Sequence, residues 1–339
     1  MHYNIIKGGY CKMKIKIYLL IFIILTPFFY SVLGYENILE ENHQNSSQIL
    51  ETNICNSIPT WEIGDMWTYK INEIVYINED LTNPINIQFS ESTLSLNVVG
   101  ISDDNYNLEY NTLQYGNFEL IVTNYNIKLF GKFNILRPLK IEGTIQINKN
   151  DLSISGFTLY LSGLFKINFA DRLFLTIPVP IDFSIELEAK PGLKIINFPL
   201  VVENIYGLPS FNITVDGDIA SPWFRVLKIV NSITRLFGKP IFSDEFAQFL
   251  PRIDFGEILK WYSGDNTYYI DNLTWYDIPV FAVASFENIT VEAGTFQAYN
   301  ITFPFEMGYI YYAPEAGSMV KLVLNPVAKM ELIETTYKI

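Results

Sequence analysis

Strict alternation of apolar and polar residues is the feature that most constrains what this chain can fold into. From Leu173 to Leu187 every odd-numbered residue is apolar, and Asp182 stands among the even-numbered ones. Successive side chains of a strand point to opposite faces, so a period of two predicts a strand with one apolar and one polar face. Pro178 and Pro180 cannot donate to a backbone ladder, which indicates that this part of the strand bends or lies at a sheet edge.

The same alternation recurs through most of the 339 residues. Further strands are predicted at 61–71, 87–125, 141–169, 195–202, 211–215 and 268–333, separated by turn sequences. At Gly156 the phase of the alternation flips, which indicates a β-bulge. We therefore predict a mainly β fold with one continuous antiparallel sheet over residues 59–339, and a division into two domains near residue 220 remains open.

One segment has the signals of a helix. Ser221 is suited to cap the first turn, Pro222 to the first helical position, and Gly238 to the end. Apolar residues recur along it at three- and four-residue steps, which predicts one apolar face. Capping residues further on predict two shorter helices, and we interpret residues 221–262 as a helical insertion.

The N-terminus has the order of a secretory signal peptide. Lys14 and Lys16 precede an apolar run at 17–29, and small residues follow before the first acidic residue. We predict a signal peptide over 1–34, with an uncleaved N-terminal anchor as the alternative, and a polar linker over 35–58. The protein is therefore expected to be exported, to the extracellular space or the cell surface. Five sequons then predict glycosylation, at Asn45, Asn212, Asn272, Asn288 and Asn300.

Composition argues against several classes of function. A formal net charge of −13 argues against nucleic acid as a partner, because phosphate binding needs a basic surface. His43 in the linker is the only histidine after the leader, so histidine-based nucleophilic catalysis and multi-histidine zinc sites are not expected in the domain. We predict a non-catalytic protein without metal or cofactor, although a carboxylate pair acting on polysaccharide is a third hypothesis.

Three motifs carry a resemblance. They are Trp61-x-x-Gly64-Asp65-x-Trp67-x-Tyr69, Val291-Glu-Ala-Gly294-Thr295-Phe296-x-x-Tyr299 and Tyr311-Tyr312-Ala-Pro314-Glu315-x-Gly317. Together they resemble exported proteins of unknown function, largely archaeal, with the curved half-barrel fold of the lipoprotein-localisation-factor (LolA-like) group. The resemblance implies an antiparallel sheet curled around an apolar concave face, with helices across its mouth. It also implies a cavity for acyl chains and no catalytic residue.

Two functional hypotheses follow. In the first, the protein binds a lipid or another apolar ligand in the concave face, and the helical insertion covers it. The roof of that cavity would be formed by Trp223, Leu227, Val230, Ile233 and Phe237. In the second, the core is filled and the protein is a structural or interaction module of the cell envelope. Arg225, Lys228 and Arg235 form either a solvated face or a contact with anionic lipid or acidic surface polymer.

Overall fold

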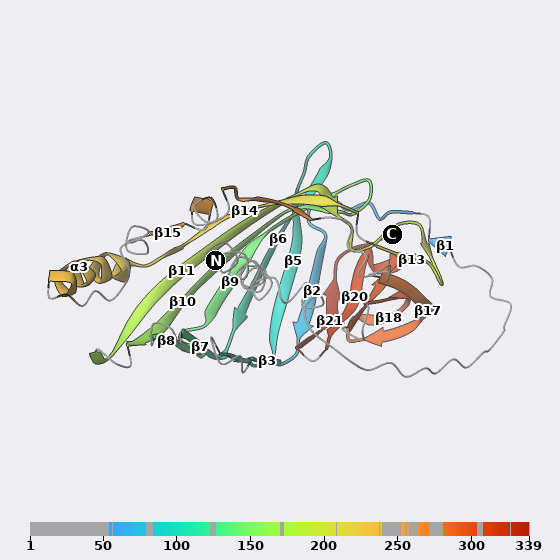
Figure 1. The fold of residues 1–339 in the computed structure, drawn as a ribbon. Helices are drawn as coiled ribbons and strands as arrows, with labels where there is room; N and C mark the ends of the chain where they lie inside the picture. The colour runs from blue at the N-terminus through green and yellow to red at the C-terminus, as the bar shows by residue number, and fades with distance from the viewer. Residues whose placement is uncertain are drawn as a thin grey trace, which may run out of the picture.

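Antiparallel strands dominate the computed structural model. It describes residues 54–338 except for 56, 79–83, 123–126, 170–172, 208, 237, 239–251, 255, 258–259, 261–263, 271–280, 304–307 and 326. The signal peptide, most of the linker, and the glycosylation sites Asn45 and Asn272 lie outside the described residues. Every registered strand pair is antiparallel, and the protein is mainly β, as predicted (Figure 1).

The structure describes over their full length the α-helix α3 (Pro222–Leu236) and the 3₁₀ turn η3 (Pro314–Ala316), and residues 256, 257 and 260 are also helical. Its strands are β1 (Ile54–Cys55), β2 (Met66–Ile71), β3 (Ile74–Asn78), β4 (Ile85–Phe89), β5 (Ser92–Ile101), β6 (Asn105–Gln114), β7 (Gly116–Val122), β8 (Ile127–Phe133), β9 (Leu139–Asn148), β10 (Ile154–Phe169), β11 (Leu173–Leu193), β12 (Leu200–Val201), β13 (Ile205–Tyr206), β14 (Phe211–Ala220), β15 (Arg252–Asp254), β16 (Thr267–Ile270), β17 (Phe281–Val291), β18 (Gly294–Thr302), β19 (Gly308–Ala313), β20 (Ser318–Leu324) and β21 (Ala328–Thr335).

One large sheet holds nearly all of these strands. Its main run has the order β13-β17-β18-β19-β20-β21-β2-β5-β6-β9-β10-β11-β14, and both β15 and β16 pair with the outer edge of β14. A side branch, β8-β7-β4-β3, joins the edge of β10 beyond the end of β9. The registered pairs complete no ring, so the described sheet is open.

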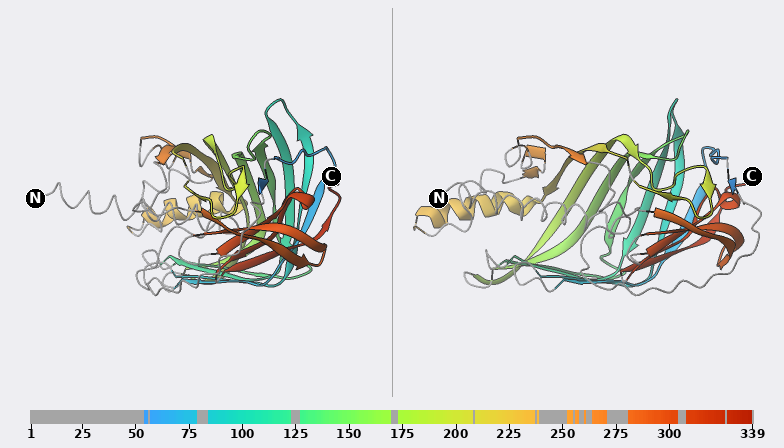
Figure 2. Two further views of the ribbon diagram at one scale, coloured as in Figure 1. Left: turned by 90° about the vertical axis from the view of Figure 1, so that its right-hand side faces the viewer. Right: turned by 45° about the vertical axis from the view of Figure 1, so that its right-hand side comes forward.

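The side branch forms because four long stretches of chain bend in the middle. The part before or after each bend pairs in the main run, and the other part pairs in the side branch. The stretches are β2 with β3, β4 with β5, β6 with β7, and β8 with β9. Gly116 stands at the third bend with φ of 141°, where a Cβ would lie 2.0 Å from the carbonyl oxygen of Gln88. The sheet therefore folds over into two walls that face each other across a trough (Figure 2).

The longest strand confirms the prediction from alternation. In β11, Pro178 and Pro180 pair with Lys166 and Leu164 of β10, whereas the pairing with β14 begins at Asp182. The prolines thus lie on an edge segment, where no further strand among the described residues needs their missing N–H groups. The predicted bulge is also present, since the register of β10 with both neighbours shifts between Ile154 and Gly156.

The first and last of the three motifs meet in space although about 250 residues separate them. The indole nitrogen of Trp67 donates to the carbonyl oxygen of Ala316 at 2.7 Å, and that of Trp61 donates to Gly317 at 2.9 Å. Tyr69 donates from its hydroxyl to the carbonyl oxygen of Met319 at 3.0 Å. These motifs therefore fasten the start of the domain to the hairpin of β19 and β20.

Helix α3 begins as predicted, with the hydroxyl of Ser221 accepting from the backbone N–H of Trp223 at 3.3 Å. It projects from the end of the sheet near the start of β11, beyond the two walls (Figures 1 and 2). Phe224 is 6% exposed and packs between the walls, whereas Ile229 and Ile233 are 60% and 50% exposed. The expectation that this helix covers the concave face is thus met only by its first turn.

The helical insertion predicted over 221–262 needs a second correction. Residues Arg252–Asp254 form strand β15, which pairs with Asp218, Ile219 and Ala220 of β14. The Arg252 guanidinium also forms an ion pair with the Asp218 carboxylate. The second of the two shorter predicted helices follows this strand, since residues 256, 257 and 260 are helical and the Asp254 carboxylate accepts from the backbone N–H of Glu257 at 2.8 Å, as its capping role predicts. The insertion is interrupted by β15 because the free edge of β14 offers Arg252–Asp254 a backbone ladder. The predicted helix at 243–250 lies outside the described residues.

Candidate functional site: an apolar cavity in the bend of the sheet

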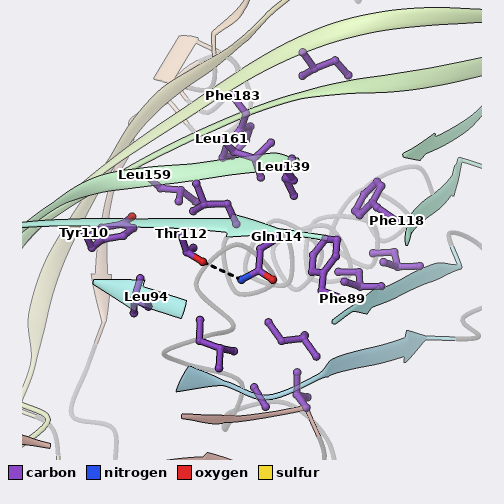
Figure 3. Close-up of a pocket in the computed structure, with 18 of the residues that line it drawn as sticks. Phe89, Leu94, Tyr110, Thr112, Gln114, Phe118, Leu139, Leu159, Leu161 and Phe183 are labelled. Atoms are coloured by element: carbon purple, nitrogen blue, oxygen red, sulfur yellow. Dashed lines mark hydrogen bonds between the residues drawn. The ribbon is translucent and has the colours of Figure 1, made fainter. Parts of the chain in front are cut away.

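A cavity of about 330 Å³ lies between the two walls of the folded sheet. Strands from both walls contribute to it, and Figure 3 shows side chains converging on it from several directions. Its lining residues are Ile71, Ile74, Ile85, Ile87, Phe89, Leu94, Tyr110, Thr112, Gln114, Phe118, Leu120, Leu129, Leu139, Ile141, Phe157, Leu159, Leu161, Phe165, Ile181, Phe183, Ile219, Leu322, Val327, Ala328 and Met330. None of them carries a charge.

The cavity is apolar because of strand periodicity. Along β10, Phe157, Leu159, Leu161 and Phe165 line it, whereas the intervening Tyr160 is 44% exposed on the opposite face. A period of two places every such set of alternate residues on one face. Because the sheet bends, the apolar faces of its two walls oppose each other, and their side chains line the space between them without filling it.

Tyr110 is one of three polar side chains in the lining. It is 5% exposed, and its hydroxyl donates to the carbonyl oxygen of Thr158 at 2.8 Å. Burial raises the pKa of Tyr110 above the ordinary value for a tyrosine. Its polar atom is therefore occupied within the protein and leaves an aromatic face toward the cavity.

The other two polar lining residues, Thr112 and Gln114, lie on the same face of β6. Gln114 is only 2% exposed, and its Nε2 donates to the hydroxyl of Ser92 at 2.8 Å. Nε2 also donates to the hydroxyl of Thr112 at 3.4 Å (Figure 3). Its Oε1 is buried and has no hydrogen-bond partner in the described structure. Buried polar atoms are nearly always paired, so this carbonyl oxygen is an unmet acceptor beside an apolar cavity.

Of the five residues predicted to form the roof, the two whose side chains the structure describes, Trp223 and Ile233, do not line the cavity. Trp223 is half-buried against the cluster around Phe133 and Phe165, and Ile233 points into solvent. The side chains of Leu227, Val230 and Phe237 lie outside the described residues. The correction has a physical reason, since helical periodicity identifies an apolar face but does not tell how far the helix extends beyond the sheet it leaves.

Phe224 is the residue of α3 that sequence reasoning missed. It packs in one cluster with Phe89, Phe165 and Ile181, all of which line the cavity, so the first turn of the helix adjoins one end of it. Its place in the sequence could have identified it, because a residue in the first helical turn after β14 stays close to the strands that pair with β14. The cavity-lining strand residues were predicted only as an apolar face.

The predicted surface residues lie as follows. Arg225, Lys228 and Arg235 are exposed on α3, so their predicted contact with an anionic surface stays a prediction. Asn212 and Asn288 are exposed on strands and accessible to modification. Asn300 differs, because its Oδ1 is buried and its Nδ2 donates to the hydroxyl of Tyr311 at 3.3 Å. A glycan on that nitrogen would disturb this contact.

The described residues contain no group of three or more His, Cys, Asp or Glu side chains placed to hold a metal ion. No described helix combines the length and the hydropathy needed to cross a bilayer. No protein-family model, curated protein or solved structure matches this chain. The apolar cavity is therefore the candidate functional site.

Proposed function

We propose that this protein binds an apolar molecule, such as a lipid chain, in the cavity between the two walls of its sheet, and that it does so without catalysing a reaction. The observation that carries the proposal is the cavity itself, in which no described lining residue has a charged side chain. Its volume of about 330 Å³ lies at the lower end of the range for small-molecule sites, which begins at about 300 Å³.

The driving force would be removal of apolar ligand surface from water. Each methylene group that enters the cavity contributes about 0.8 kcal/mol to binding. Cavities lined by leucine, isoleucine and phenylalanine stay dry and accept apolar guests, because water finds no hydrogen-bond partners in them.

We also propose that the protein is exported, and the resemblance to exported proteins with a half-barrel fold supports a carrier role. An apolar molecule needs a carrier when it crosses an aqueous space outside the cell, and a deep trough between sheet walls meets that need. The alternative of an envelope module with a filled core is less well supported. Close-packed interiors hold few voids larger than a water molecule, and this cavity has a volume of about 330 Å³.

A pair of variants on β10 tests the proposal. Leu161 lines the cavity, and the adjacent Tyr160 is exposed on the other face of the same strand. We expect Leu161→Trp to fill part of the cavity and Tyr160→Trp to leave it open. The measurement is a fluorescence titration of each purified protein with the apolar dye N-phenyl-1-naphthylamine.

The wild type and Tyr160→Trp should bind the dye with the same affinity, and Leu161→Trp should bind it at least tenfold more weakly. Circular dichroism and thermal unfolding check that both variants remain folded. Equal binding by all three folded proteins would place the dye elsewhere and remove the proposal.

A further inference from the structure

We infer that the ligand of the cavity is an uncharged apolar molecule with one hydrogen-bond donor, a hydroxyl group, which pairs with Oε1 of Gln114. This inference rests on the proposed function and names the class of molecule the cavity selects. It starts from Oε1 of Gln114, a side-chain acceptor in the lining that has no hydrogen-bond partner among the described residues.

The surroundings of Gln114 explain why its oxygen is left for a ligand. Nε2 is held by the hydroxyls of Ser92, at 2.8 Å, and Thr112, at 3.4 Å. These contacts, on neighbouring β5 and on β6 itself, fix the amide. The amide is 2% exposed, so bulk water does not satisfy Oε1 either. A buried acceptor without a partner costs free energy, and a donor brought by the ligand would recover it.

The absence of charge from the lining decides between polar groups on the ligand. A carboxylate or phosphate in the cavity would lose its hydration and find no cation among the lining residues. Its oxygens would also face the oxygen of Gln114, and two acceptors do not pair. A hydroxyl group is uncharged and donates one hydrogen bond, which matches what Gln114 lacks.

The test uses four probes with one twelve-carbon chain: dodecane, dodecanol, dodecyl methyl ether and dodecanoate. Each competes with the dye for the wild type, for Gln114→Met and for Gln88→Met. Methionine removes the acceptor and keeps approximately the size of glutamine. Gln88 is the matched control, because it is exposed on β4 between two lining residues, Ile87 and Phe89.

We expect Gln114→Met to lower the affinity for dodecanol roughly three- to tenfold, the range of one hydrogen bond. Gln88→Met should leave that affinity unchanged. Dodecane and the methyl ether, which cannot donate, should bind Gln114→Met as well as or better than the wild type. Dodecanoate should be the weakest competitor for the wild type.

Two kinds of failure are distinguishable. If no probe competes and the dye does not bind, the proposed function itself fails. If dodecane binds but Gln114→Met changes dodecanol and the ether by the same factor, the cavity is a site without a donor requirement and this inference is overturned. The wild-type comparison of dodecanoate with dodecanol tests the exclusion of charge even where Gln114→Met does not fold.

A second, independent observation concerns the turn between β8 and β9. Ile135 and Leu136 form its tip and are 86% and 90% exposed. The turn is rigid, because Asn134 and Arg137 exchange two backbone hydrogen bonds, of 3.1 and 2.9 Å. Turn tips normally carry Gly, Asn, Asp or Ser, so two large aliphatic residues here expose apolar surface without a conformational reason.

We propose that this tip inserts into the interface of an anionic lipid bilayer. Lys132 and Arg137 are exposed beside it, and no acidic residue occurs between Glu119 and Glu142 in a chain whose net charge is −13. An apolar tip with flanking cations matches the interface of such a bilayer, where the side chains enter the acyl boundary and the cations contact headgroups.

Flotation with lipid vesicles tests this second proposal. The variant is Ile135→Ser with Leu136→Ser, and the control is Val99→Ser with Ile101→Ser, which removes two exposed apolar residues from β5. On vesicles of phosphatidylcholine with phosphatidylglycerol, the tip variant should partition at least tenfold less than the wild type, and the control should not change.

On phosphatidylcholine alone the wild type should bind more weakly, because the electrostatic attraction is lost. Equal partition of the tip variant and the wild type would overturn the proposal. Concentration-dependent self-association that the tip variant abolishes, without vesicle binding by the wild type, would assign the tip to a second copy of this chain and also overturn it.

Discussion

The hydroxyl of Tyr110 reaches across strand β9 and donates to the carbonyl oxygen of Thr158 on β10, at 2.8 Å. The ring crosses over Gly143, where a Cβ would lie 2.6 Å from the tyrosine hydroxyl and 2.0 Å from the Thr158 carbonyl oxygen. The glycine thus permits the tyrosine to span three strands of one cavity wall. Two predictions follow for stability.

Replacement of Tyr110 by phenylalanine should reduce the free energy of unfolding by about 1 kcal/mol, because it removes one hydrogen bond and keeps the ring. Gly143→Ala should cost more, since the added methyl group collides with backbone and not with a mobile side chain end. Chemical denaturation measures both. A Gly143→Ala protein as stable as the wild type would show that the ring does not lie over the glycine.

The indole of Trp67 supports a third stability prediction. Trp67 is fully buried and donates to the carbonyl oxygen of Ala316 at 2.7 Å. Trp67→Phe leaves that carbonyl without its partner and creates a small void, so it should cost roughly 3 kcal/mol. Trp223→Phe, at a half-buried position, is the control and should cost under about 1 kcal/mol. Equal losses would contradict the fastening role of the motif.

The anchoring of α3 by Phe224 gives a prediction about local stability. Phe224→Ala should release the first turn from the sheet and raise the rate of amide hydrogen exchange along α3. Ile229→Ala removes a side chain that is 60% exposed and should leave exchange unchanged. The free energy of global unfolding should change less than the exchange rate along α3, because only the start of the helix contacts the core. Unchanged exchange in Phe224→Ala would place the anchor elsewhere.

Asp218 provides a prediction about pH. The Arg252 guanidinium and the Ser184 hydroxyl, which lies 3.0 Å from Oδ1, hold the pKa of this carboxyl below its ordinary value of 3.8. A lowered pKa in the folded state stabilises the protein fully above pH 3.8, and the contribution is lost as pH falls toward the folded value.

We therefore expect Asp218→Asn to be less stable than the wild type at neutral pH by up to about 1 kcal/mol, the range of an exposed ion pair. The difference should shrink as pH falls below 3.8. Denaturation of both proteins at several pH values measures it. A difference that stays constant to pH 2 would mean that the amide disturbs packing and that charge plays no part.

Much of the fold could be predicted from alternation alone. The strand around Leu173 to Leu187, the edge position of Pro178 and Pro180, and the bulge at Gly156 each follow from local rules of strand geometry. The bends could not be predicted, because short interruptions such as Tyr115 read as ordinary turns. Whether a chain reverses or continues after a turn depends on which strands pair, and pairing is not local.

The candidate site was harder to predict for the same reason. Thr112 and Gln114 continue the buried face of β6, but because the apolar Leu113 stands between them, the sequence alone makes them look like a polar pair on a solvent face. Their burial results from the opposite wall, which β4, β7 and β8 form far along the sheet. The capping residues of α3 predicted where this helix begins, but they could not predict that most of it extends beyond the cavity.

The central claim is that the cavity holds an apolar molecule, and native mass spectrometry of the protein gently purified from its source tests it most directly. The account predicts a mass above that of the polypeptide by one small neutral molecule, which Leu161→Trp loses and Tyr160→Trp retains. Bare polypeptide in the wild type, together with failure to take up dodecanol added at saturation, would contradict it.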